Sequence, residues 1–165
     1  MSSARRPRQT IVVAVDGSAS SAQALRWAAR QAAVTGGELH AVTAWRLPDY
    51  SGWAAVVDDV DWAENGRMVL EQTIKETLEP AEAARTERHV IEGHPAEVLL
   101  HQAADADLLV VGSRGHGGFA GMLLGSVSQH VIAHAPCPVV VVHGDRLPSP
   151  EAAGSAAPSP SPSED

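Results

Sequence analysis

The segment LLVVGSRGHGGFAGMLLGS, residues 108–126, joins an apolar run to a glycine-rich loop and then to the start of a helix. Its first four residues are all apolar, a pattern typical of a parallel strand that is buried on both faces. The residues Gly112, Gly115, Gly125 and Ser126 that follow have the spacing G-x2-G-x9-G-S. This order of strand, loop and helix predicts an α/β fold, in which ligands bind beyond the carboxyl ends of parallel strands.

Apolar runs and helical periodicities alternate along the rest of the chain. The expected strands are residues 11–15, 39–44, 86–91, 108–111 and 139–142. The expected helices begin at Ser18 or Ser20, Arg67, Pro95 and Gly125. Five strands alternating with four helices predict right-handed crossovers and a doubly wound parallel sheet. The third strand is more polar than the others and is therefore expected nearer an edge.

The connection after the second strand is long and acidic. Residues 47–66 show no clear periodicity, and a connection of this length is usually functional or mobile. It is interpreted either as a solvated excursion or as a flap over a ligand site. The helix expected from Arg67 to about Ala84 contains Pro80, which should bend or end it.

Length and composition fit one ordinary globular domain, because 165 residues with 44% hydrophobic content can bury one sizeable core. The domain is expected over residues 10–146. Residues 1–9 are polar, and residues 147–165 are rich in Pro, Ser and acidic side chains. Both ends have too little apolar surface to fold and are expected to be disordered.

Charge and hydropathy exclude several functions. The formal net charge of -8 argues against nucleic acid as the main partner, because such binding rests on clustered Lys and Arg. No apolar run is long enough to span a bilayer, and the N-terminus lacks a signal-peptide pattern, so no membrane association and a cytoplasmic location are expected. Cys137 is the only cysteine, which excludes an intramolecular disulfide and indicates a small buried hydrophobe.

Two segments should meet where the strand order reverses: Asp16, directly after the first strand, and the loop after the fourth. Gly112 and Gly115 have no Cβ, so backbone N–H groups can approach phosphate oxygens closely. Gly125 and Ser126 open the last helix, whose N-terminus favours an anion. Ser126 and Ser128 can add hydroxyl donors. These features together predict a phosphate-binding loop.

Other interpretations of these residues stay open. Asp16 can serve only as a helix cap, and Arg114 and His116 can be solvated loop residues. The histidines are not expected to form a metal site, although His130 and His134 have i, i+4 spacing, and metal ligands stay unassigned.

The stretches VAVDGSASSAQAL, DADLLVVGSRG and LLGSVSQHVIAHAPCPVVVV resemble the universal stress protein family. The resemblance covers roughly residues 10–143 without a gap. It implies a Rossmann-like sheet of five parallel strands in the order 3-2-1-4-5, and usually a dimer. The glycine spacing is the one that marks the family's ATP-binding members, so the resemblance implies ATP, with Mg²⁺, as the ligand.

The resemblance also assigns residues to the nucleotide. Ala14, Val15 and Asp16 are expected beside it, with Val42 or Ala44 against adenine. Val111, Gly112, Arg114 and Gly115 are expected on the ribose and phosphate side, and Gly125, Ser126, Val127 and Ser128 at the phosphates. Asp16 is expected to hold ribose or adenine, or to help bind a divalent ion.

Three functions follow as hypotheses. The first is a regulatory module that binds ATP in a stress response. The second is a slow ATPase or (auto)phosphotransferase, for which the phosphate loop supplies no lysine. The third is an interaction protein that needs no nucleotide.

The segment Val139–Val142 is apolar on both faces and by resemblance an edge strand, so a homodimer joined through it is expected.

Overall fold

The computed structural model describes residues 8–47, 61–116, 121 and 123–144. Five parallel strands form one sheet in the order β3-β2-β1-β4-β5, which confirms the predicted doubly wound, Rossmann-like topology. The strands are β1 (Thr10–Ala14), β2 (Glu38–Trp45), β3 (Thr86–Glu92), β4 (Leu108–Gly112) and β5 (Val139–Val142). The helices are α1 (Ala19–Thr35), α2 (Trp62–Thr77), α3 (Pro80–Arg85), α4 (Pro95–Ala103) and α5 (Ser126–His134).

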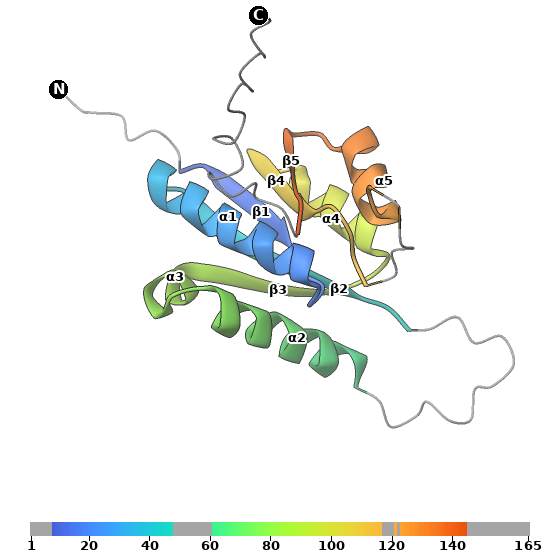
Figure 1. Cartoon of the computed structure of the whole chain (residues 1–165), viewed down its shortest axis with the longest axis horizontal. Helices are drawn as coiled ribbons and strands as arrows, with labels where there is room; N and C mark the ends of the chain where they lie inside the picture. Colours follow the sequence, from blue (N-terminus) through green and yellow to red (C-terminus); the bar gives the residue numbers. More distant parts are fainter. Residues whose placement is uncertain (1–7, 48–60, 117–120, 122, 145–165) are drawn as a thin grey trace, which may run out of the picture.

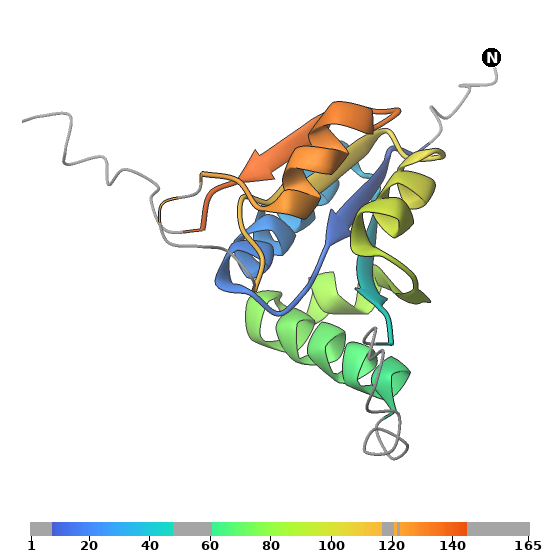
Figure 2. The same ribbon diagram turned by 90° about the vertical axis from the view of Figure 1, so that its right-hand side faces the viewer.

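The sheet is covered on both faces, as Figures 1 and 2 show. Successive residues of a strand point to opposite faces. On β1, Ile11 and Val13 pack in one core with α1 and α2, whereas Val12 packs in a second core with α4 and α5. All three side chains are at most 2% exposed. This double burial explains why the strand sequences are apolar runs and not alternating patterns.

The strand order reverses between β1 and β4. From β1 the chain first adds β2 and β3 on one side, and then adds β4 and β5 on the other. β1 lies beside β4 with Ile11 opposite Leu108. The chain continues from β1 into α1 and from β4 into α5, and these two helices pack on opposite faces of the sheet. A cleft beyond such a reversal is the expected ligand position in this class of sheet.

The second helical region differs from its prediction. Helix α2 begins at Trp62, not at Arg67, because the Asp61 carboxylate caps it by accepting a hydrogen bond from the Glu64 N–H at 2.9 Å. Pro80 does end this helix, and it also begins the next one, α3, at a first-turn position where its missing N–H costs nothing. The described residues therefore contain five helices, one more than expected.

Several expectations fall outside the described residues. These are the disorder expected for residues 1–7 and 147–165, and most of the acidic connection with its flap interpretation. Among the residues that are described, no helix is long and apolar enough to cross a membrane.

Cys137 is only partly buried and packs against the second core. Burial raises the pKa of its thiol, and the nearby Asp107 charge adds to this effect.

Candidate functional site

A cavity of about 360 Å³ opens beyond the carboxyl ends of β1 and β4, which lie side by side in the sheet (Figure 2). This volume is within the range of small-molecule sites. The residues assigned to the site from the sequence all line it, namely Ala14, Val15, Asp16, Val42, Ala44, Val111, Gly112, Arg114, Gly115, Gly125, Ser126, Val127 and Ser128. The fold therefore brings the whole predicted set together, while a nucleotide-binding role for these residues stays a prediction.

The two sides of the cavity differ in chemistry. On the β2 side the lining is apolar, with Val42 and Ala44 from the strand and Leu99 from α4. On the β4 side the glycine-rich loop and the start of α5 line it, with Arg114 and Ser126 among the polar residues. Such a cavity suits a ligand with an apolar ring at one end and an anionic group at the other.

Asp16 lines the cavity next to the glycine loop. Its Oδ1 accepts hydrogen bonds from the backbone N–H of Ser18 at 2.9 Å and from the Ser18 hydroxyl at 2.5 Å. Its Oδ2 faces Gly115, where an added Cβ would lie 2.7 Å away. Asp16 is not itself the N-cap of α1, because Ser18 holds that position and accepts from the N–H of Ser21 at 3.2 Å.

The loop after β4 is held against the start of α1. The Ser20 hydroxyl donates to the Arg114 carbonyl oxygen at 2.7 Å and accepts from the Arg114 N–H at 3.2 Å. A Cβ on Gly112 would lie 2.1 Å from the Ser20 Oγ. Gly112 and Gly115 thus provide space for Ser20 and Asp16. Neither has a positive φ, so a tight left-handed turn is not the reason for glycine at these positions.

Helix α5 presents its N-terminus to the cavity. Its N-cap is Gly125, which has no side chain to bond the free N–H groups of the first turn, and Ser126, Val127 and Ser128 of that turn all line the cavity. Uncapped first-turn amides and the positive end of the helix dipole favour an anion. The Ser128 hydroxyl, expected as a ligand donor, instead donates to the Gly112 carbonyl oxygen at 2.7 Å and so fixes the loop.

The lining also includes residues that were not assigned from the sequence: Ser21, Pro95, Leu99 and His116. Pro95 and Leu99 come from the first turns of α4, which follows the edge strand β3. The apolar periodicity of that helix was visible, but nothing in it indicates which end approaches the site. The Nε2 atom of His116 lies 3.4 Å from where a Cβ on Gly17 would be, so this ring covers the turn after Asp16.

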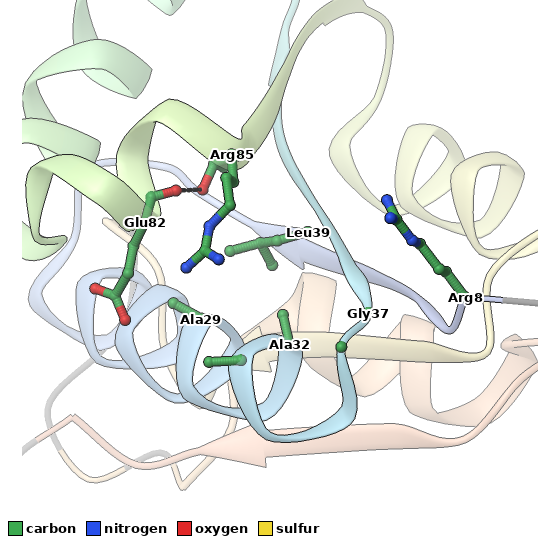
Figure 3. A pocket seen from close by; sticks show the side chains of 10 residues that line it. Arg8, Ala29, Ala32, Gly37, Leu39, Glu82 and Arg85 are labelled. Atoms are coloured by element: carbon green, nitrogen blue, oxygen red, sulfur yellow. Dashed lines mark hydrogen bonds between the residues drawn. The ribbon is translucent and has the colours of Figure 1, made fainter.

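A second, smaller cavity of about 220 Å³ shares no lining residue with the first. Figure 3 shows its apolar floor of Ala29, Ala32 and Leu39, with the guanidinium of Arg85 above that floor. It lies near the start of β2 and the end of α1, at the amino ends of the strands. No residue predicted for the site lies in it.

The sheet order and the covering helices define a Rossmann-like α/β domain of the doubly wound kind. The family model described as "Universal stress protein family" matches residues 7–143, and the chain belongs to this family. A universal stress protein of Mycobacterium tuberculosis is 38% identical over 140 residues, which are 82% of this chain and 46% of that protein. One from Thermus aquaticus is 35% identical over 148 residues, covering 81% of this chain and 98% of that protein.

Solved structures support the same fold. A universal stress protein crystallised in complex with cAMP is 31% identical with a TM-score of 0.60, covering 82% of this chain and 97% of that one. The protein UspA from Lactobacillus plantarum has a TM-score of 0.68 at 23% identity, over 83% of this chain and 99% of that one. The chain spans about half the length of the mycobacterial relatives that it matches.

Proposed function

We propose that this chain binds ATP, with Mg²⁺, in the cavity beyond β1 and β4 and acts as a nucleotide-dependent regulatory module in a stress response. The observation that carries the proposal is the uncapped N-terminus of α5 facing a cavity whose opposite side is apolar. The phosphates lie against the α5 amides and Gly115, and adenine lies against Val42 and Ala44. The cAMP complex of a 31% identical relative supports an adenine nucleotide as ligand.

Asp16 fits a role in holding Mg²⁺. It is the only carboxylate among the described residues that line the cavity. Mg²⁺ is typically bound through one or two carboxylates together with substrate phosphates and waters. Oδ1 of Asp16 is engaged by Ser18, whereas Oδ2 is turned toward the loop. When bound, the ion would neutralise phosphate charge beside this oxygen.

We expect the protein to turn over Mg-ATP at less than about one per second, below the roughly 1–100 per second of kinases. Backbone amides and one arginine hold a triphosphate in its ground state, and rate requires contacts that strengthen in the transition state. Release of ADP under saturating Mg-ATP measures this rate. Faster turnover that disappears in Gly125→Asp would favour the alternative of an ATPase or phosphotransferase, with Arg114 or His116 stabilising charge at the cavity wall.

Calorimetric titration with ATP, ADP, AMP and cAMP, each with and without Mg²⁺, tests the proposed ligand. We expect ATP to bind at one site per chain and to lose affinity as phosphates are removed, because the α5 amides contact them. Binding of cAMP alone would contradict the triphosphate assignment. Absence of binding by all four nucleotides would favour the interaction protein that needs no nucleotide.

A homodimer through Val139–Val142 and a cytoplasmic location remain predictions from the sequence. The dimer is supported by the position of β5 at the edge of the sheet, with all four valines only partly buried in the single chain. An exposed apolar edge strand is a ready template for another chain.

A further inference from the structure

Three potential metal ligands meet on the face of the sheet that α4 and α5 cover, toward the amino ends of β2 and β3. His40 lies on β2, and Glu87 and His89 lie on the neighbouring edge strand β3 (Figure 1). In the register of the two strands His40 is opposite Glu87, and Val42 is opposite His89. Since alternate residues of a strand share a face, all three side chains lie on the same face as Val42.

The ligand atoms form a small triangle. Nδ1 of His40 lies 3.2 Å from Nε2 of His89, and the Glu87 Oε2 lies 3.8 Å and 3.7 Å from these two nitrogens. Two imidazole nitrogens that face each other at this distance cannot both present bare lone pairs. A proton or a metal ion must lie between them, and the carboxylate favours a cation there.

We propose that His40, Glu87 and His89 form a zinc-binding site that joins β2 to β3. Zinc bonds to histidine nitrogen and carboxylate oxygen are about 2.0–2.2 Å long in tetrahedral geometry, which places neighbouring ligand atoms about 3.3–3.6 Å apart. The three observed separations bracket this range. Two neutral imidazoles and one carboxylate are a ligand set that zinc favours over Mg²⁺ or Ca²⁺, which prefer oxygen ligands.

Burial permits both anchoring and access. The side chain of His40 is 20% exposed, that of His89 31% and that of Glu87 59%, so the ion enters from the Glu87 side and a water completes the tetrahedron. The two rings are nearly parallel, with an interplanar angle of 11° and centroids 5.1 Å apart. In this arrangement the two nitrogens face each other. A tilt of the His89 ring would turn both nitrogens toward one zinc ion.

The affinity should be moderate. Most zinc-bound histidines donate their second ring N–H to an acceptor, and loss of such a partner costs roughly 10–100-fold in metal affinity. Within the described part of the chain, Nε2 of His40 is buried without a hydrogen-bond partner. We therefore expect weaker binding than at a structural site whose ligands all have such partners.

The test uses the full, nucleotide-free chain and Zn²⁺ alone, titrated against a competing chelator dye. We expect one Zn²⁺ per chain. Loss of a ligand should cost at least as much affinity as loss of a ligand's hydrogen-bond partner, so Glu87→Gln and His89→Gln should bind Zn²⁺ at least about tenfold more weakly. His134→Gln is the matched control, because His130 and His134 also form a close pair, with ring centroids 4.5 Å apart on α5, but have no third ligand among the described residues. It should bind Zn²⁺ like the wild type.

Cobalt(II) adds a readout of geometry, since tetrahedral cobalt absorbs visible light far more strongly than octahedral cobalt. We expect the strong bands in the wild type and in His134→Gln, and their loss in His89→Gln. Circular dichroism in the presence of chelator establishes that each variant is folded. Wild-type affinity in folded His89→Gln, loss of binding in His134→Gln, or no stoichiometric Zn²⁺ in the wild type would each overturn the proposal.

Discussion

At the scale of single residues, Asp16 has two oxygens in different environments. Oδ1 accepts from the backbone and the hydroxyl of Ser18 and thereby fixes the turn between β1 and α1. Oδ2 faces the glycine loop at Gly115. A single side chain thus supports the local fold with one atom and offers negative charge to the site with the other.

This division predicts the effect of Asp16→Asn. The amide oxygen can still accept from Ser18, so the fold should be retained, while the charge that would attract Mg²⁺ is lost. Without Mg²⁺, we expect ATP affinity to stay equal or to rise, because a carboxylate near phosphates repels them. The gain in ATP affinity on adding Mg²⁺ should fall about tenfold or more, which corresponds to about 1.4 kcal/mol. Calorimetry of both proteins with and without Mg²⁺ measures this, and an unchanged gain in the variant would remove Asp16 from the ion's site.

At the scale of elements, the start of α1 positions the loop that follows β4. Ser18 caps the helix, and Ser20, in the first turn, bonds both backbone groups of Arg114. The helix, the turn after β1 and the glycine loop therefore form one hydrogen-bonded unit next to the cavity. Loss of the cap should loosen the helix and the loop together.

We accordingly expect Ser18→Ala to lower the free energy of unfolding by about 1 kcal/mol, the usual value of an N-cap, and Tm by about 2–4 °C for a domain of this size. Ser18→Asp, which keeps an oxygen acceptor for the Ser21 N–H, should recover much of this loss, although its charge lies near Asp16. Urea denaturation of the three proteins gives the comparison. Equal stability of wild type and Ser18→Ala would show that the cap contributes little here.

The elements also show what could be predicted from the sequence. Strands buried on both faces are apolar runs, and the helix starts at Ser18 and Pro95 are recognisable, so the parallel sheet and most helices were predicted from the residues themselves. The strand order 3-2-1-4-5 was predicted through the resemblance to the universal stress protein family. The start of α2 was missed because Asp61 was assigned to an acidic connection and not to an N-cap.

The site could be predicted only in part. Asp16 and the glycine loop were found because they follow the ends of two recognisable strands, whereas Val42 and Ala44 were assigned through the family resemblance. Gly112 leaves space for Ser20, which is more than ninety residues away in the chain, and spacing along the sequence cannot reveal such a contact. The cluster of His40, Glu87 and His89 was missed for the same reason, because it depends on the register between two strands.

At the scale of the whole molecule, β5 ends the sheet and is the edge through which two chains can pair. We expect the wild type to sediment as a dimer at micromolar concentration and Val141→Glu to shift it toward monomer, because a charge would be buried between two edge strands. Ile132→Glu places the same charge at an exposed position on α5 and should leave the dimer intact. Val141 also packs against its own core, so circular dichroism must show that the variant is folded. A wild type that sediments as a monomer would contradict this assembly.

The central claim, that the N-terminus of α5 and the glycine loop bind the phosphates of ATP, is tested most directly by calorimetric titration of Gly125→Asp. A Cβ at Gly125 would make ordinary contacts, 3.5 Å from the Gly115 nitrogen, so the fold tolerates it, while the carboxylate would fill the phosphate position and repel the ligand. Ala133→Asp adds the same charge at an exposed position of the same helix and serves as the control. We predict no measurable ATP binding by folded Gly125→Asp and wild-type binding by Ala133→Asp. Wild-type affinity in folded Gly125→Asp would contradict the claim.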